Sequence, residues 1–291
     1  MSAHRVSSGT ETEPTSLAAL LRQHDRDRFQ TALFAPAARR PALFALYAFN
    51  FEVARIREVT REPMLGQIRL QWWRDAIAEI YAGAAPRRHG VVEALSLAIR
   101  EHGLSRAHFD ALLAARELDL SDDAPASLEA LEAYVEGTSS SLVLLALEVL
   151  GARDAEAVAV GQAVGIGYAL AGLLAAMPFH AAMKRVYLPQ DMIESAEIDL
   201  ARSLFELKPS APLADSVHEI AALAEYHLGA ARAQRAGVPR KALAALLPAV
   251  LAARRLMILA SADYNVFDPR FSRPDPRQSW RLAWAALRGR Y

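Results

Sequence analysis

A group of polar side chains follows an apolar segment near the start of the chain. From Leu43 to Phe51 the sequence is apolar on almost every face, and a helix of that kind has to be buried. Arginine and glutamate then follow at helical spacing, so a buried helix would turn polar groups onto one face. That face could line the mouth of a cavity, or it could emerge into solvent. The positions close to it are Asn50, Ala54, Arg57 and Glu58.

These residue types suit the binding of a polyanion better than the holding of a metal ion. Arginine matches the geometry of phosphate oxygens and keeps its charge at physiological pH. Arg55, Arg57 and the distant Arg185 could therefore hold a diphosphate group without metal. Magnesium is usually held by one or two carboxylates together with substrate phosphates. Glu58 is the only carboxylate among the four positions on the polar face.

A second cluster, His24, Asp25 and Asp27, contains the side-chain types of a metal site. Neighbouring residues do not share a face of a helix, so this spacing favours a solvated helix end instead. The chain contains no cysteine, which excludes disulfides, thiolate metal sites and a cysteine nucleophile.

Size and composition allow one large core or two smaller ones. The chain has 291 residues, of which 53% are hydrophobic, and a formal net charge of +0. It therefore has ample material for a core and no global field that would attract nucleic acid. The apolar runs Leu142–Leu150 and Ala242–Ala253 are shorter than the roughly 20 residues that cross a bilayer. We expect a cytoplasmic protein or one peripheral to the inner membrane, with a disordered tail over residues 1–16 and a single domain over 17–291.

The pattern predicts helices throughout and no strand. The first helix should start near Leu17, capped by Thr15 or Ser16. A helix over Met64–Ala82 should bury Trp72, with Trp73 at its flank. Its predicted apolar face consists of Leu65, Ile68, Trp72, Ala76 and Ile80.

The last predicted helix, Ser279–Arg290, has an aromatic face with arginines nearby. Such a helix could contact a membrane surface weakly. Docking of the same face onto the protein's own core is the preferred interpretation. The face consists of Trp280, Trp284 and Leu287.

Several short motifs together resemble the squalene/phytoene synthase family. The resemblance implies an all-α isoprenoid-synthase-type helical bundle around a central cavity, in which two Asp-rich helices hold magnesium and a prenyl diphosphate. The matching motifs are ALYAF at Ala45–Phe49, the WWR that starts at Trp72, YLP at Tyr187–Pro189 and YNVF at Tyr264–Phe267.

At the positions that match the two Asp-rich motifs, this chain departs from the family. The resemblance places the first motif at Ala54–Glu58, where two positions are arginine and only Glu58 is acidic. It places the aspartates of the second motif at Ala176 and His180. Arg185 and Tyr187 are retained. A serine of the substrate pocket is replaced by Arg28. The sequence is most similar to a non-catalytic branch that includes a mitochondrial assembly factor of respiratory complex I.

We therefore expect a pseudoenzyme with a binding or assembly role, with a respiratory-complex subunit as its partner and without a cofactor. An active head-to-head prenyl-diphosphate synthase with an altered magnesium site is the alternative, because ionisation of a diphosphate needs cations that neutralise the leaving group. A binder of a lipid or prenyl diphosphate is the third hypothesis. The residues expected at a cavity or diphosphate site are Asn50, Arg57, Glu58, Arg185 and Tyr187.

Overall fold

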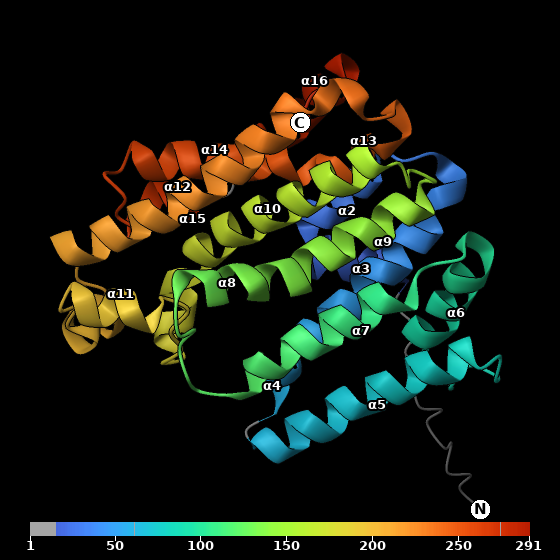
Figure 1. Cartoon of the computed structure of the whole chain (residues 1–291), viewed down its shortest axis with the longest axis horizontal. Coiled ribbons are helices and arrows are strands. Elements are labelled where there is room, and N and C mark those ends of the chain that lie inside the picture. Colours follow the sequence, from blue (N-terminus) through green and yellow to red (C-terminus); the bar gives the residue numbers. More distant parts are fainter. Residues whose placement is uncertain (1–15, 61, 274) are drawn as a thin grey trace, which may run out of the picture.

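The computed structural model describes residues 16–60, 62–273 and 275–291, and within these ranges it contains helices and no strand (Figure 1). The predicted all-α fold is confirmed. The tail predicted over 1–16 lies outside the described residues except for Ser16. Its hydroxyl accepts a hydrogen bond of 3.2 Å from the backbone nitrogen of Ala19, which caps α1 (Leu17–His24) as predicted.

The apolar segment forms α3 (Arg40–Ala54), with Pro41 in its first turn, where a missing N–H costs nothing. The helix is buried on almost every face, as predicted, and packs against α1, α6 (Gly90–His102) and α9 (Ser141–Val149). The helix ends at Ala54. The chain turns at Arg55 and resumes as the short α4 (Ile56–Val59).

The next helix, α5 (Pro63–Tyr81), is rotated relative to the prediction. Trp73 is 5% exposed and packs edge-to-face on Phe49, whereas Trp72 is only half-buried. Leu65 and Ile68 are 49% and 60% exposed. The prediction of a buried Trp72 with Leu65 and Ile68 on the same face is therefore wrong. The face that contacts the core contains Leu70, Trp73, Ile77 and Ile80, a second helical register that the sequence also allows.

A long helix, α10 (Ala155–Ala182), runs through the middle of the molecule (Figure 1). It packs against α9, α12 (Ala211–Ala233) and α14 (Pro248–Ala260). By length and composition, α10 could also cross a membrane. The sequence analysis considered only the shorter apolar runs Leu142–Leu150 and Ala242–Ala253 and did not identify this helix. In the structure, 61% of that apolar window is buried inside the molecule, as expected of a core helix.

Small residues let α10 cross the preceding helix closely. That helix consists of α8 (Leu128–Val135), a π-helical turn (Glu136–Ser140) and α9. A Cβ on Gly165 would lie 2.4 Å from the Cα of Ser140, so only glycine fits there. The hydroxyl of Ser140 also donates a 2.7 Å hydrogen bond to the carbonyl oxygen of Gln162. Small side chains at Gly137–Ser141 thus permit a tight helix crossing.

The last helix, α16 (Gln278–Arg288), is held by Leu282, which is fully buried. Its aromatic face points outward: Trp280, Trp284 and Leu287 are 79%, 56% and 70% exposed. The preferred prediction, that this face docks onto the core, is wrong. The remaining helices are α2 (Arg26–Ala32), α7 (Arg106–Ala115), α11 (Gln190–Ser195), α13 (Leu243–Leu246), α15 (Pro269–Ser272), three short 3-10 turns (Ala37–Arg39, Arg235–Gly237 and Arg240–Ala242), a 3-10 segment (Arg116–Leu120) and a second π turn (Ala201–Phe205).

Candidate functional site

A hollow of about 420 Å³ lies between α2, α8, α10 and α14. We call it the central hollow. Three arginines line it: Arg28 from α2, Arg116 from the segment after α7, and Arg255 from α14. The α10 wall consists of one tyrosine, one leucine and small side chains. Its lining residues are Tyr168, Ala169, Gly172, Leu173, Ala175 and Ala176.

Two of these arginines are held by aspartates and by one tyrosine ring. The guanidinium of Arg28 lies 2.9 Å from the carboxylate of Asp25, and Arg255 forms an ion pair with Asp27. Both guanidinium groups lie over the ring of Tyr168, at 5.2 and 5.5 Å from its centroid. Burial raises the pKa of the Tyr168 hydroxyl, so it stays neutral.

The third arginine belongs to a buried network around Asp119, which is 5% exposed. The carboxylate of Asp119 lies 2.9 Å from Arg116 and 3.0 Å from Arg185. It also accepts hydrogen bonds from the hydroxyls of Tyr134 (2.7 Å) and Tyr187 (3.1 Å). Burial alone would raise the pKa of Asp119, but the two guanidinium groups outweigh burial and hold that pKa below its ordinary value.

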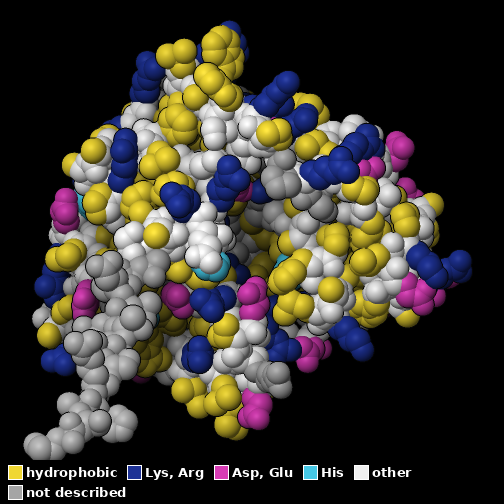
Figure 2. Space-filling model, turned by 180° about the vertical axis from the view of Figure 1, so that it is seen from behind, with side chains coloured by type: hydrophobic (Ala, Val, Ile, Leu, Met, Phe, Trp, Pro, Cys, Tyr) yellow, Lys and Arg dark blue, Asp and Glu magenta, His cyan; other side chains and the backbone are white. Residues whose placement is uncertain are grey.

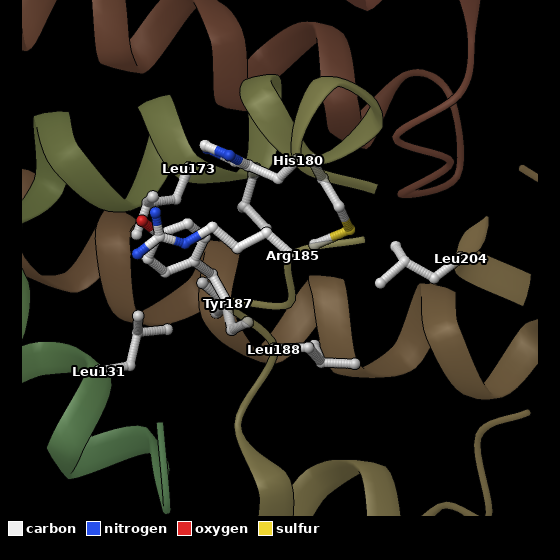
Figure 3. Close-up of a pocket in the computed structure, with 10 residues that line it drawn as sticks. Leu131, Leu173, His180, Arg185, Tyr187, Leu188 and Leu204 are labelled. Atoms are coloured by element: carbon white, nitrogen blue, oxygen red, sulfur yellow. The ribbon is translucent and has the colours of Figure 1, made fainter. Parts of the chain in front are cut away.

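Next to this network lies a small apolar cavity of about 10 Å³, room for about one water molecule. Figure 3 shows Arg185 beside Tyr187, with His180 on the neighbouring helix and leucines around them; the guanidinium lies 4.6 Å from the centroid of the tyrosine ring. Burial, and then the charge of Arg185, lowers the pKa of His180 to about 4, so its imidazole is neutral at pH 7. Arg185 and Tyr187 were expected at a cavity or diphosphate site. Their polar groups instead bind the carboxylate of Asp119.

The first motif-like segment does not line the hollows described here. Arg57 forms an ion pair with Asp122, and Glu58 is exposed to solvent. Arg55 lies 5.1 Å from the centroid of the Phe51 ring. Asn50 is 5% exposed, and its Oδ1 has no hydrogen-bond partner among the described residues.

The second motif-like segment is split between two cavities. Ala176 lines the central hollow, whereas His180 lines the small apolar cavity one turn further along α10. Ala54, at the start of the first segment, is half-buried at the end of α3. The structure therefore does not bring the two segments together in one hollow.

These residues do not fit a magnesium cluster of the kind the family resemblance implies. Among the residues that the structure describes, the central hollow is lined by three arginines and by no acidic side chain. In the described part of the chain, no three histidine, aspartate or glutamate side chains are grouped so that they could hold one metal ion. The three aspartates nearest the hollow, Asp25, Asp27 and Asp119, each lie against an arginine.

For two of these aspartates, the prediction of a solvated helix end is wrong. Asp25 and Asp27 were predicted at a solvated helix end, but their side chains are 13% and 17% exposed. Asp25 caps α2 and accepts a 3.1 Å hydrogen bond from the backbone nitrogen of Arg28. Asp27 accepts a 2.7 Å bond from Gln278 of α16. Their spacing along the chain suggested exposure because the partners of Asp27 are more than 140 residues away in sequence.

Sequence analysis missed most of the residues that define the central hollow. Arg116 and Asp119 could have been noticed as an i, i+3 pair of opposite charge in a helical segment. Nothing local marks Arg255 or Tyr168, because their contacts join α14 and α10 to α2.

The arrangement of helices is that of the squalene-synthase type of fold. A dehydrosqualene synthase crystal structure matches with a TM-score of 0.80 and 18% sequence identity, over 94% of each chain. The squalene synthase of Alicyclobacillus acidocaldarius matches with a TM-score of 0.75 and 20% identity, over 86% of this chain and 93% of that one. At these identities the likeness concerns the fold alone.

The sequence places the chain within a family. The squalene/phytoene synthase family model matches residues 21–287, so the chain belongs to that family. The bovine NADH dehydrogenase (ubiquinone) complex I assembly factor 6 is 31% identical over 90% of this chain and 80% of its own length, and the human protein is 30% identical over 91% and 81%. A presqualene diphosphate synthase of Rhodopseudomonas palustris is 29% identical over 56% of this chain and 58% of its own length.

Proposed function

We propose that this protein is a non-catalytic member of the squalene/phytoene synthase family that acts in the assembly of respiratory complex I. Its similarity to the bovine and human assembly factors extends over nine-tenths of the chain, whereas its similarity to the presqualene diphosphate synthases covers little more than half. The partner would be a subunit or assembly intermediate of the complex, and the site of action would be the cytoplasm or the inner membrane surface.

One observation carries this proposal: the acids that adjoin the central hollow are neutralised by arginines of the same chain. Ionisation of an allylic diphosphate requires cations that stabilise the leaving group more in the transition state than in the ground state. Arg28, Arg116 and Arg255 could bind a diphosphate, but each already contacts an aspartate or a tyrosine ring. Such an arrangement favours binding over turnover.

The assembly role is tested by deletion of the gene in the source organism, followed by a native-gel assay of complex I. We expect loss of the assembled complex and rescue both by the wild-type protein and by Glu58→Ala, because Glu58 is exposed and lines none of the hollows described here. Unchanged complex I in the deletion strain would overturn the role.

The absence of catalysis is tested with purified protein, farnesyl or geranylgeranyl diphosphate, and magnesium or manganese. We expect no C30 or C40 product. Formation of such a product, and its loss in Glu58→Ala, would show that the chain is a working synthase with an altered metal site.

A second candidate function, the binding of a lipid or prenyl diphosphate, is favoured by the lining of the central hollow, which combines three arginines with small and apolar side chains of α10. The buried Nε of Arg116 and hydroxyl of Ser139 have no hydrogen-bond partner among the described residues, and both residues line the hollow. The guanidinium groups that line the hollow would contact a diphosphate group, because arginine matches the geometry of phosphate oxygens. The alanines and leucine of α10 would contact an apolar chain.

This binding role is tested by native mass spectrometry of gently purified protein. We expect a bound lipid that is lost in Gly172→Leu, because a side chain at Gly172 meets nothing within 4 Å and would extend into the hollow. Gly229→Leu, on an equally open position of α12, is the matched control. A wild-type protein that is consistently empty would contradict this second function without touching the assembly role.

A further inference from the structure

The outward face of α16 has the composition of a membrane-contacting surface. Trp280, Trp284 and Leu287 follow at spacings of four and three, so they share one face of the helix, and all are more than half exposed. Met257 of α14, 60% exposed, lines the same hollow as Trp284. We call these four residues the α16 surface. Four large apolar side chains left in water at one place mark an interaction site.

The helix that carries this surface is firmly attached to the protein. On its inner side, Leu282 is fully buried. At its start, the amide of Gln278 donates hydrogen bonds of 2.7 Å to Asp27 and 2.9 Å to Gln30, both of α2. The two tryptophans are therefore exposed on a helix that is packed against the rest of the protein.

Beside the α16 surface lies a hollow of about 370 Å³ between α12, α14 and α16. In the described part of the chain, it is lined by arginines and apolar side chains and by no acidic side chain. Only one of these arginines forms an ion pair within the described residues: Arg281, with Asp275 at 2.9 Å. The buried Nε of Arg254 has no hydrogen-bond partner there, and Arg288 lies 4.1 Å from the centroid of the Trp284 ring. The lining arginines are Arg232, Arg254, Arg281, Arg288 and Arg290.

Positive charge is concentrated at this end of the molecule. Residues 269–291 contain six arginines and one aspartate, although the whole chain has a net charge of +0. Figure 2 shows the result: along the upper edge, where α16 lies, hydrophobic and basic side chains occur together, without acidic side chains between them. The local field therefore attracts anions even though the molecule as a whole is neutral.

We propose that the α16 surface docks the protein onto an anionic phospholipid bilayer. Indole rings favour the level of the lipid headgroups, where their apolar body and polar N–H are both accommodated. Arginine matches phosphate oxygens, and each basic residue close to an anionic leaflet adds to the attraction. A zwitterionic bilayer offers no net charge to the five arginines, so the charge pattern selects anionic lipids.

Docking through this surface would bring a larger hollow close to the lipid. A space of about 570 Å³ extends from Arg254 and Arg281 to α2 and α10, and it shares Ala175 and Arg255 with the central hollow. The face seen in Figure 2 is visibly hollowed near its centre. The central hollow thus adjoins a space that would lie close to the membrane, with Ala175 and Arg255 between the two.

The proposal is tested by co-sedimentation of the full chain with vesicles of phosphatidylcholine alone or with about one-third phosphatidylglycerol. We expect binding to the anionic vesicles only, weakened by salt because exposed charges are screened. Trp280→Ser/Trp284→Ser should lower the partition coefficient about tenfold, since binding scales with the apolar area inserted. Arg288→Gln/Arg290→Gln should lower it about fivefold for each charge removed.

Matched controls come from α5, which also exposes apolar and basic side chains. Met64→Ser/Ile68→Ser removes two side chains that are 69% and 60% exposed, and Arg69→Gln removes an exposed charge. We expect both controls to bind like the wild type. Thermal unfolding would verify that every variant folds.

Three outcomes would overturn the proposal. One is the absence of wild-type binding to anionic vesicles, and another is loss of binding in the α5 variants but not in the α16 variants. The third is a dimer in solution that Trp280→Ser/Trp284→Ser converts to a monomer, with no vesicle binding by either form. That result would assign the α16 surface to a second copy of the chain.

Discussion

Asp119 is a buried carboxylate that two arginines and two tyrosine hydroxyls hold in place. It joins the segment after α7 to Arg185 and Tyr187, which follow α10, so its charge links two parts of the chain that are distant in sequence. Removing the charge would leave Arg116 and Arg185 buried without compensation, and breaking a buried ion pair in this way is strongly destabilising.

We therefore predict that Asp119→Asn lowers the free energy of unfolding at pH 7 by about 3–5 kcal/mol. Because the pKa of Asp119 is lowered in the folded protein, its stabilisation is complete above the ordinary aspartate pKa and is lost as the pH falls through the lowered one. The difference between wild type and variant should shrink in acid. Urea unfolding at pH 7 and at pH 3 measures both effects.

Asp122→Asn is the control for that experiment, because its side chain is 84% exposed although it pairs with Arg57. An exposed pair contributes about 1 kcal/mol or less. If Asp119→Asn lowered the free energy of unfolding by as little as Asp122→Asn does, the network around Asp119 would not be stabilising the fold as proposed.

His180 should make the protein sensitive to mild acid. Its pKa is about 4 in the folded state, below the ordinary histidine value of 6.5, so the unfolded chain binds a proton more readily between these values. The free energy of unfolding should therefore fall as the pH drops from about 6.5 to 4, by up to about 3 kcal/mol. His180→Gln should flatten the dependence in this window. An unchanged profile in the variant would show that other groups cause it.

At the scale of helices, the crossing of α10 over the π-helical turn depends on one glycine. We predict that Gly165→Ala destabilises the fold by about 1–3 kcal/mol, because its Cβ would meet the backbone of Ser140 at 2.4 Å and one of the helices must move. Chemical denaturation measures the loss.

Gly172→Ala, two turns along the same helix, provides the comparison. A Cβ there meets nothing within 4 Å, and alanine favours a helix by up to about 1 kcal/mol over glycine. Its free energy of unfolding should be unchanged or higher. Equal destabilisation at both glycines would mean that the crossing does not explain the loss at Gly165, because alanine is the better helix former at both positions.

The helices also show which parts of the pattern were ambiguous. The pattern of α5 allows two faces, and the sequence alone favoured the face with Trp72. The structure uses the face with Trp73, because Phe49 of α3 offers a partner for that ring at 5.3 Å. Helical periodicity identifies the helix, but the side that packs is decided by the neighbour.

At the scale of the whole molecule, the burial of α10 determines how the protein can associate with a membrane. This helix could span a bilayer by composition, but most of its apolar window is already covered by other helices. We predict that membrane-bound protein is released by alkaline carbonate, which removes peripheral proteins and leaves spanning ones. Retention in the pellet would show that α10 leaves the core and inserts.

The sequence by itself determined that the fold is all-α and which family it belongs to, because helical periodicity and short framework motifs are local properties. It also revealed the loss of acidic residues at both motif-like segments, since residue types can be read directly. The tertiary structure decided where charge is compensated. Asp27 meets Arg255 and Asp119 meets Arg185 only after distant helices pack, and the same packing leaves Trp280 and Trp284 facing outward. Ion pairs and burial depend on distances in space, which spacing along the chain does not fix.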